Sequence, residues 1–169
     1  LAALGRVAGV VVGRDRHKRD AAAVATRHDA PVDVPQWMAG VADALDAPVE
    51  RFGGELADSG FEAVRIRDSG IPPWQEVGLY HPEDGTLLVP EAVGTAAYFR
   101  APGEPLGVHP MLRPVPPRRE LSRFDPERVL VGHGAGVDTD AAAALDDALD
   151  NARSNLPGAY GQALKQLLS

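Results

Sequence analysis

The sequence predicts an α/β (α+β) fold, because strands and helices succeed one another along most of the chain. A strand–helix–strand unit opens the sequence, a β-hairpin lies in its middle, and a further strand leads into a helix near the end. This order is typical of mixed α/β layouts. The 169 residues are enough for one domain with its own hydrophobic core. We therefore expect a single domain over residues 1–169.

The first third of the chain predicts two strands and two helices. Residues 6–12, RVAGVVV, are rich in β-branched side chains and are typical of a buried strand. Residues 18–28 carry alanine and valine at helical spacing and predict a helix. Pro31 ends that helix, because proline disfavours a helical conformation in the residue before it. Residues 32–34 then predict a second strand and residues 36–46 a short helix.

The middle of the chain predicts a β-hairpin. Residues 61–67 alternate apolar and polar side chains, which indicates a half-buried strand, and residues 70–74 predict a loop. Residues 76–81 and 86–89 are two strands joined by the turn 82–85, PEDG. Proline early and glycine late in a four-residue connection favour a type I turn closed by a left-handed glycine.

A proline-rich stretch follows the hairpin. Residues 101–120 contain six of the chain's 15 prolines, namely Pro102, Pro105, Pro110, Pro114, Pro116 and Pro117. Because proline breaks helices, the stretch predicts an extended surface loop. It carries His109 and Arg113. A loop of this length serves either to cover a binding cleft or to strap the core, and the sequence leaves both open.

The last third of the chain predicts one strand and two helices. Residues 128–131 form a short apolar run typical of a buried strand. A helix then begins at Asp138 or Thr139, either of which can cap it, and ends near residue 155. Residues 159–167 predict a final short helix.

Composition and charge exclude several classes of function. The chain has no cysteine, so it has no disulfide, no thiolate zinc site and no cysteine nucleophile. The net charge of −7 disfavours binding to nucleic acid. No apolar run has the roughly 18 residues that a membrane span needs. These features favour a soluble, cytoplasmic protein without a membrane partner. The chain begins with Leu1 and not with Met, so it is either processed or part of a longer sequence, and we favour the second alternative.

The triplet Gly132-His133-Gly134 is the most informative motif. Glycines on both sides allow a histidine to sit at a sharp corner after a strand, with its ring toward a cleft. This arrangement suits a metal ligand or a general base, so His133 is the candidate catalytic residue. A histidine in a glycine-rich turn is also compatible with a purely structural role.

Four segments, in the right order, resemble the metallo-β-lactamase superfamily. The segment VVVGRDRHKRDAAAVATRHDAPVDV resembles its strand, HxHxDH turn, helix and next strand. The segment DSGIPPWQEVGLYHPEDG resembles the TPGHTPG region and the hairpin after it. TLLVPEAVGT resembles the strand before the metal-bridging aspartate, and VLVGHG the last metal-ligand segment. The resemblance implies an αββα sandwich that is short of its N-terminal strands.

The resemblance also implies which positions would bind metal. The HxHxDH ligands fall on Val12, Arg14, Arg16 and His17. The histidine of TPGHTPG falls on Pro72, the bridging aspartate on Glu91 and the last histidine on His133. Valine and proline cannot coordinate a metal, and arginine repels a cation. A standard dinuclear zinc site is therefore not expected.

Two functions remain open under this resemblance. In the first, the metal site is degenerate and Arg14, Arg16 and Arg19 bind a small anionic ligand without a cofactor, because guanidinium groups suit carboxylate or phosphate. The alternative for these arginines is a surface turn in which they pair with nearby acids.

In the second, His17, Glu91 and His133 hold a single zinc ion, and the protein is a metal-dependent hydrolase with an altered mononuclear site. Whether the protein is an enzyme thus depends on that metal. A third possibility is an unrelated α/β binding domain. If the N-terminal strands are missing, a sheet edge is exposed, and we expect self-association into a homo-oligomer.

Overall fold

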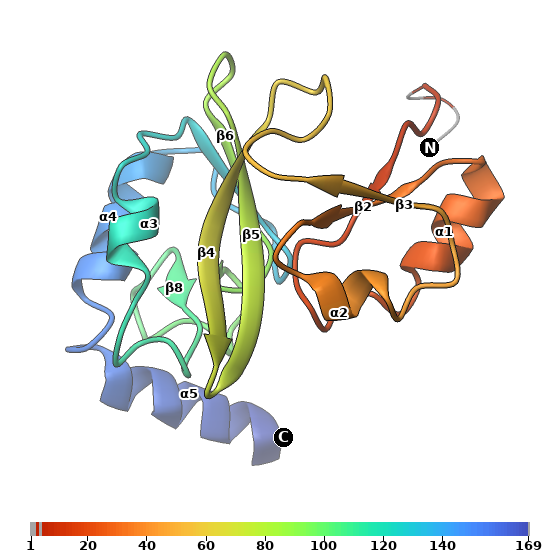
Figure 1. The fold of residues 1–169 in the computed structure, drawn as a ribbon. Helices are drawn as coiled ribbons and strands as arrows, with labels where there is room; N and C mark the ends of the chain where they lie inside the picture. Colours follow the sequence, from red (N-terminus) through yellow and green to blue (C-terminus); the bar gives the residue numbers. More distant parts are fainter. Residues whose placement is uncertain (1–2, 4, 169) are drawn as a thin grey trace.

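The computed structural model describes residue 3 and residues 5–168, with side chains described as far as residue 162 (Figure 1). The helices are α1 (Ala21–His28), α2 (Ala39–Ala42), α3 (Arg118–Leu121), α4 (Ala141–Asp150) and α5 (Leu156–Leu168). The strands are β1 (Val10–Val11), β2 (Val32–Pro35), β3 (Val49–Phe52), β4 (Glu62–Gly70), β5 (Pro73–His81), β6 (Thr86–Val89), β7 (Val93–Gly94), β8 (Gly107–Val108) and β9 (Arg128–Val131). Among the described residues, no helix is both long and apolar enough to span a bilayer.

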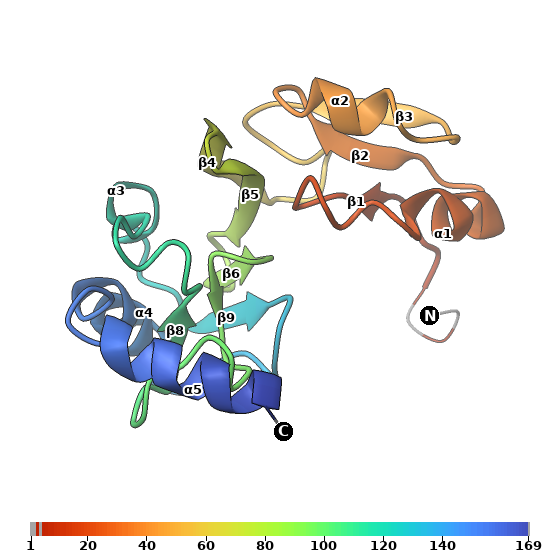
Figure 2. The ribbon, with the colours of Figure 1, turned by 90° about the horizontal axis from the view of Figure 1, so that it is seen from below.

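Two sheets form the centre of the molecule, with helices on their outer sides (Figure 2). The first sheet has the order β1-β2-β3 and is parallel throughout. The second has the order β4-β5-β6-β9, in which only β6 and β9 are parallel. Helices α1 and α2 contact the first sheet, while α3 and α4 contact the second. This layering is the αββα sandwich that the sequence predicts.

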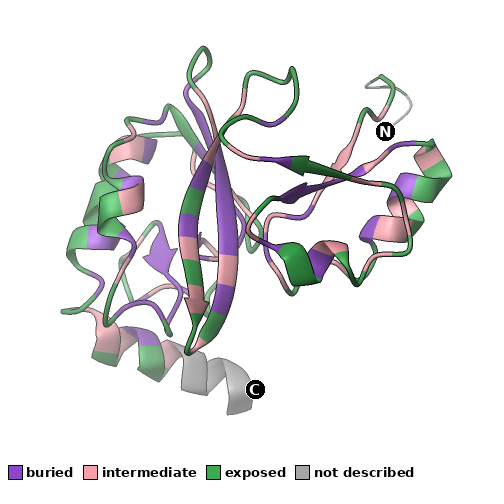
Figure 3. Ribbon diagram, viewed as in Figure 1, coloured by how far each residue is buried: buried purple, intermediate pink, exposed green. Residues whose placement is uncertain are grey.

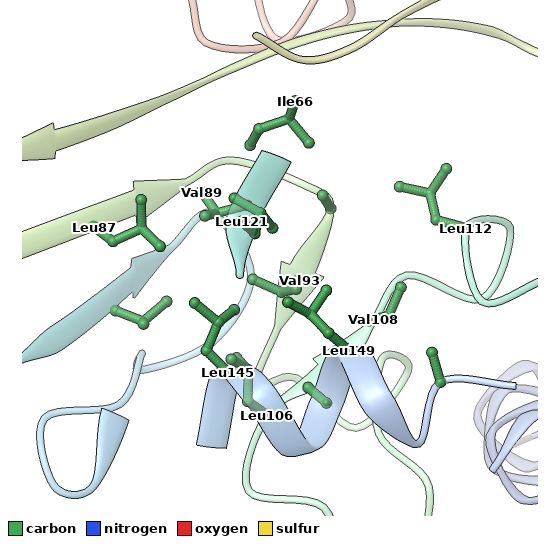
Figure 4. Close-up of a cluster of buried hydrophobic side chains, with 14 of the residues drawn as sticks. Ile66, Leu87, Val89, Val93, Leu106, Val108, Leu112, Leu121, Leu145 and Leu149 are labelled. Carbon is green, nitrogen blue, oxygen red and sulfur yellow. The ribbon is translucent and has the colours of Figure 1, made fainter. Parts of the chain in front are cut away.

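Strand β5 joins the two halves of the core, because residues along it are buried in both hydrophobic clusters (Figure 3). Val77 and Leu79 pack with α1, α2 and the first sheet. Trp74 belongs to the other cluster, in which α4 covers the second sheet. The residues labelled in Figure 4 show the latter cluster, in which Leu145 and Leu149 project from α4 toward β6 and β7.

The predicted β-hairpin is confirmed. Thr86 pairs with His81, and Gly85 closes the turn with a left-handed φ of 61°. The preceding loop prediction for residues 70–74 is wrong. Pro73 already pairs with Gly70, so Trp74 lies in β5 and the turn is shorter than expected. Strands β4 and β5 pair as far as this turn, because β4 continues to Gly70 whereas the alternation in the sequence indicates a strand that ends at residue 67.

The proline-rich stretch is not a surface loop. It contains β8 and α3, and Leu106, Val108 and Leu112 are buried in the core. Arg113 is completely buried, and its guanidinium donates hydrogen bonds to the Glu104 carboxylate at 3.0 Å and to the carbonyl of Phe99 at 2.7 Å. Buried apolar residues thus lie between the prolines of this stretch, and their packing holds the stretch against the core.

Several predicted boundaries near the N-terminus were too wide. The strand expected over 6–12 is paired only at β1, where β2 supplies a neighbour. The helix expected over 18–28 begins at Ala21, and the one expected over 36–46 is the four-residue α2. Pro48 leads the chain out of α2 into β3, a parallel strand that the sequence pattern did not predict.

The C-terminal elements lie close to their predicted positions. Strand β9 occupies residues 128–131 as expected. Neither Asp138 nor Thr139 caps the next helix; α4 begins after Asp140, which has a left-handed φ of 50° and makes no side-chain capping hydrogen bond. Helix α5 begins at Leu156, three residues before the predicted start.

Candidate functional site

Parallel pairing of β6 and β9 brings Glu91 and His133 together. Val89 is the register partner of Val131, and each strand is followed two residues later by one of these side chains. The carboxyl ends of neighbouring parallel strands lie at the same sheet edge, so residues that follow them meet. His17 arrives from the turn after β1. Backbone hydrogen bonds between this turn and β5, including Val77 N–H to Gly13 carbonyl at 2.9 Å, hold that turn in place.

The three side chains converge on one carboxylate oxygen. His17 Nε2 and His133 Nε2 each lie 3.0 Å from Glu91 Oε2. One donor atom from each residue lies within 4.8 Å of the other two. The two rings meet edge to face with centroids 5.8 Å apart. The side chain of Glu91 is 16% exposed, whereas those of His17 and His133 are 40% and 44% exposed, so the cluster faces solvent through its histidines.

The two glycines beside His133 are needed for close approach and for a positive φ. A Cβ at Gly132 would lie 2.2 Å from the carbonyl oxygen of Pro90, the residue before Glu91. Gly134 has a φ of 111°, which L side chains rarely adopt. The carbonyl of His133 accepts hydrogen bonds from the N–H groups of Thr95 and Ala96, each at 3.0 Å. The Gly-His-Gly corner is therefore fixed against the segment that carries Glu91.

His109 supports the other oxygen of Glu91. Its Nε2 lies 3.5 Å from Glu91 Oε1, and its Nδ1 accepts the N–H of Met111 at 3.2 Å. Because Nδ1 is an acceptor, the neutral ring carries its proton on Nε2 and donates toward Glu91. Burial lowers the pKa of His109 to about 4, so the ring is neutral at pH 7. The sequence marked His109 only as a residue of a possible cover for a cleft.

Glu76 fixes the backbone under the site and was not predicted as a site residue. It is fully buried on β5 and accepts hydrogen bonds from Glu91 N–H at 2.7 Å, Ala92 N–H at 2.8 Å and Trp74 Nε1–H at 2.7 Å. Burial raises the pKa of Glu76 to about 7, although these donors and Arg14 act to lower it. Its only signal in the sequence is an acid within the otherwise largely apolar strand 76–81.

A pocket of about 240 Å³ opens over this cluster. Its lining includes the three converging residues together with Arg14, Arg16, Pro72, Pro73, Trp74, His109 and Met111. Arg19 lies elsewhere. It lines a neighbouring, more open hollow that shares Arg16 and His17 with this pocket, its side chain is 89% exposed, and it pairs with Asp20 at 3.1 Å. The structure thus brings two of the three predicted arginines to the pocket and leaves the third outside.

The electrostatics of His17 suit metal coordination. Burial lowers the pKa of His17, although the neighbouring carboxylate of Glu91 acts to raise it. Only the neutral imidazole can coordinate a metal, so this shift favours a ligand role. Glu91 adds a carboxylate to two imidazole nitrogens, which is a ligand set found in catalytic zinc sites.

The residues present fit one metal ion but not two. Val12 is buried with no donor atom, and Pro72 lines the pocket without one. Arg14 and Arg16 bring positive charge to the same pocket, which repels any cation there and adds no ligand for a second one. The donor set of His17, Glu91 and His133 supplies three ligands within reach of a single ion.

Comparison with solved structures assigns the fold. The DIM-1 metallo-β-lactamase, exposed to ceftazidime, superposes with a TM-score of 0.53 at 15% identity, covering 88% of this chain and 67% of the other. TMB-1, in a study of substrate and inhibitor binding, gives a TM-score of 0.55 at 13% identity, covering 91% and 69%. Diflavin flavoprotein A 5 from Nostoc sp. PCC 7120, as fragment 1–254, gives 0.58 at 17% identity, covering 95% and 71%.

These likenesses show that the chain has a metallo-β-lactamase fold, as its sequence motifs predict. No protein-family model matches the sequence, and no curated protein matches it. At such low identity the likeness defines the fold alone. What the site does must be argued from its own residues.

Proposed function

We propose that this pocket holds a single divalent metal ion, most simply zinc, and that the protein is a mononuclear metal-dependent hydrolase. The observation that carries the proposal is the convergence of His17, Glu91 and His133 within 4.8 Å of one another at the base of a pocket. Three protein ligands with an open side are the pattern of catalytic rather than structural zinc. A bound zinc ion would supply Lewis acidity toward a substrate carbonyl or phosphoryl group.

The protein's own residues prepare such a site in two ways. His109 and Glu76 hold the side chain and the backbone of Glu91, so the carboxylate keeps its second oxygen toward the two histidines. Groups that hold a metal ligand in this way orient it and raise metal affinity. His17 and His133 are partly exposed, so the side facing the pocket stays open to a substrate.

A specific observation favours a second, metal-free function. Glu91 Oε2 lies at hydrogen-bonding distance, 3.0 Å, from the Nε2 atoms of both histidines. The cluster can therefore be satisfied without an ion. In that case the fold is a degenerate one that binds a ligand without metal chemistry.

Metal analysis separates the two functions. Protein purified without added metal is expected to contain about one divalent ion per chain. Zinc added to stripped protein is expected to raise thermal stability, because a ligand at a hundred times its Kd stabilises the native state by about 2.7 kcal/mol. His133→Ala should abolish the increase, whereas His28→Ala, at the end of α1, should retain it.

The opposite results are equally informative. Two ions per chain would contradict a mononuclear site. An absence of bound metal, together with no effect of zinc on wild-type melting, would overturn the proposal and favour the metal-free function.

A further inference from the structure

We propose that Arg14 and Arg16 form a subsite for the oxyanion group, carboxylate or phosphate, of a small substrate. The inference rests on the proposed function in that it takes the same pocket to be the reactive site. It names the class of molecule that the pocket accepts. Both arginines line the pocket together with His17, Glu91 and His133.

Arg14 is a fixed cation in the wall of the pocket. Its residue is only 3% exposed, and its guanidinium lies 3.9 Å from the centroid of the Trp74 ring. Its Nη1 donates to the Asp15 carboxylate and, at 3.4 Å, to the carbonyl of Gln75. Its buried Nε has no hydrogen-bond partner among the described residues. Because these contacts hold the group in one place, little side-chain entropy is lost when an anion binds.

Arg16 supplies the charge that is not already paired. Among the described residues, no carboxylate lies within ion-pair distance of it, in contrast to Arg14 with Asp15 and Arg19 with Asp20. Burial lowers the pKa of Arg14, Glu76 and Glu91 act to raise it, and repulsion by the nearby charge of Arg16 lowers it by a smaller amount. An anion between or beside them relieves this repulsion and accepts their forked N–H donors.

The pocket restricts the size and character of the rest of the molecule. Its volume of about 240 Å³ is below the range of drug-sized ligand pockets, so a small compound fits. Trp74 and Met111 provide apolar surface beside the charged groups. The guanidiniums would thus hold the anionic end while the metal-ligand cluster faces the bond to be cleaved.

Binding of two simple anions tests the subsite. Inorganic phosphate and acetate are titrated into the whole chain, stripped of metal and desalted, with isothermal calorimetry as the readout. Wild-type protein and Arg19→Met should bind the preferred anion equally, because Arg19 lies outside the pocket. Arg16→Met should weaken that binding about tenfold, as expected for the loss of a charge-assisted hydrogen bond. The tighter of the two probes identifies phosphate or carboxylate as the recognised group.

Two outcomes of the same titration would contradict an oxyanion subsite. If neither anion binds wild-type protein at millimolar concentration, or if Arg16→Met binds as well as wild type, there is no oxyanion subsite. Arg16 is exposed, so its variant should melt as the wild type does, and Arg14→Lys provides a second variant that keeps the charge but loses the fork.

Failure of this inference differs from failure of the metal proposal. Arginine-dependent anion binding in stripped protein that takes up no zinc would support the subsite and refute the metal site. Zinc uptake without arginine-dependent anion binding would support the metal site and refute the subsite.

Discussion

The carboxylate of Glu76 accepts the backbone N–H of Glu91 across 2.7 Å, and through this contact a buried strand fixes the residue on which two histidines converge. The same carboxylate also accepts Trp74 Nε1–H, and Trp74 in turn carries the guanidinium of Arg14 on its ring. One buried acid thus connects the metal-ligand cluster with the arginine side of the pocket.

Glu76→Gln should weaken both the fold and the site. A glutamine cannot accept all three hydrogen bonds, because one of its two terminal atoms is a donor. Leaving a buried donor unpaired costs about 1–3 kcal/mol of unfolding free energy. Displacement of Glu91 should lower zinc affinity about 10- to 100-fold, the usual effect of removing a group that orients a metal ligand. Urea denaturation and zinc titration measure the two effects.

Glu62→Gln is the matched control, because Glu62 is an exposed residue of the neighbouring strand β4. It should change neither quantity. If Glu76→Gln loses stability but binds zinc as tightly as wild type, Glu76 is a core residue and does not position the site.

Gly132→Ala should separate His133 from Glu91. The added Cβ would lie 2.2 Å from the carbonyl oxygen of Pro90, and backbone cannot yield as a flexible side chain does. We expect the stabilisation by zinc to be lost even at high zinc concentration. Gly70→Ala is the control, since a Cβ there meets no atom within 4 Å. Retention of the zinc effect in Gly132→Ala would contradict the close packing of these two segments.

The stability of metal-free protein should depend on pH through His109. Burial lowers the pKa of His109 to about 4 in the folded protein, against 6.5 for an exposed histidine. Between these values the unfolded chain binds more protons than the folded one. The contribution of His109 is therefore complete above pH 6.5 and is lost as the pH falls toward 4, with a limiting slope of about 1.4 kcal/mol per pH unit.

Glu76 acts in the opposite direction over an overlapping range. Its pKa is raised from 4.5 to about 7, so the folded protein holds its proton where the unfolded chain has released it. Its contribution therefore falls as the pH rises from about 4.5 to 7. Denaturation curves from pH 4 to 7.5 should show a weaker rise in stability with pH for His109→Gln than for wild type, and a steeper rise for Glu76→Gln. His28→Gln is the matched control, and identical slopes in all four proteins would refute both assignments.

Local signals were sufficient for the hairpin and for the Gly-His-Gly corner. A turn of the form PEDG closes two strands because its glycine takes a positive φ, which depends on four neighbouring residues alone. The prediction of a loop over residues 70–74 was wrong because strand pairing there depends on residues outside that segment. Whether Trp74 pairs in β5 depends on how far β4 extends, because the partner of Trp74 is Ser69 of that strand.

Some residues of the site were predicted from the sequence, and others were found only in the structure. His17, Glu91 and His133 were named as candidate ligands because the family resemblance places metal-ligand positions on them. Glu76 and His109 were not, because nothing beside them in the sequence indicates what they contact. Glu76 reaches the Glu91 backbone 15 residues away, and His109 reaches the Glu91 carboxylate from within the proline-rich stretch.

The sequence by itself determined the alternation of strands and helices, the Gly-His-Gly corner and the presence of arginines in the early turn. These properties reside in residue types and short spacings. Only the tertiary structure decided that Arg14 and Arg16 share a pocket with the three possible ligands while Arg19 lies outside it. The physical reason is that pairing of β6 with β9, and docking of the early turn on β5, set distances between residues far apart in the chain.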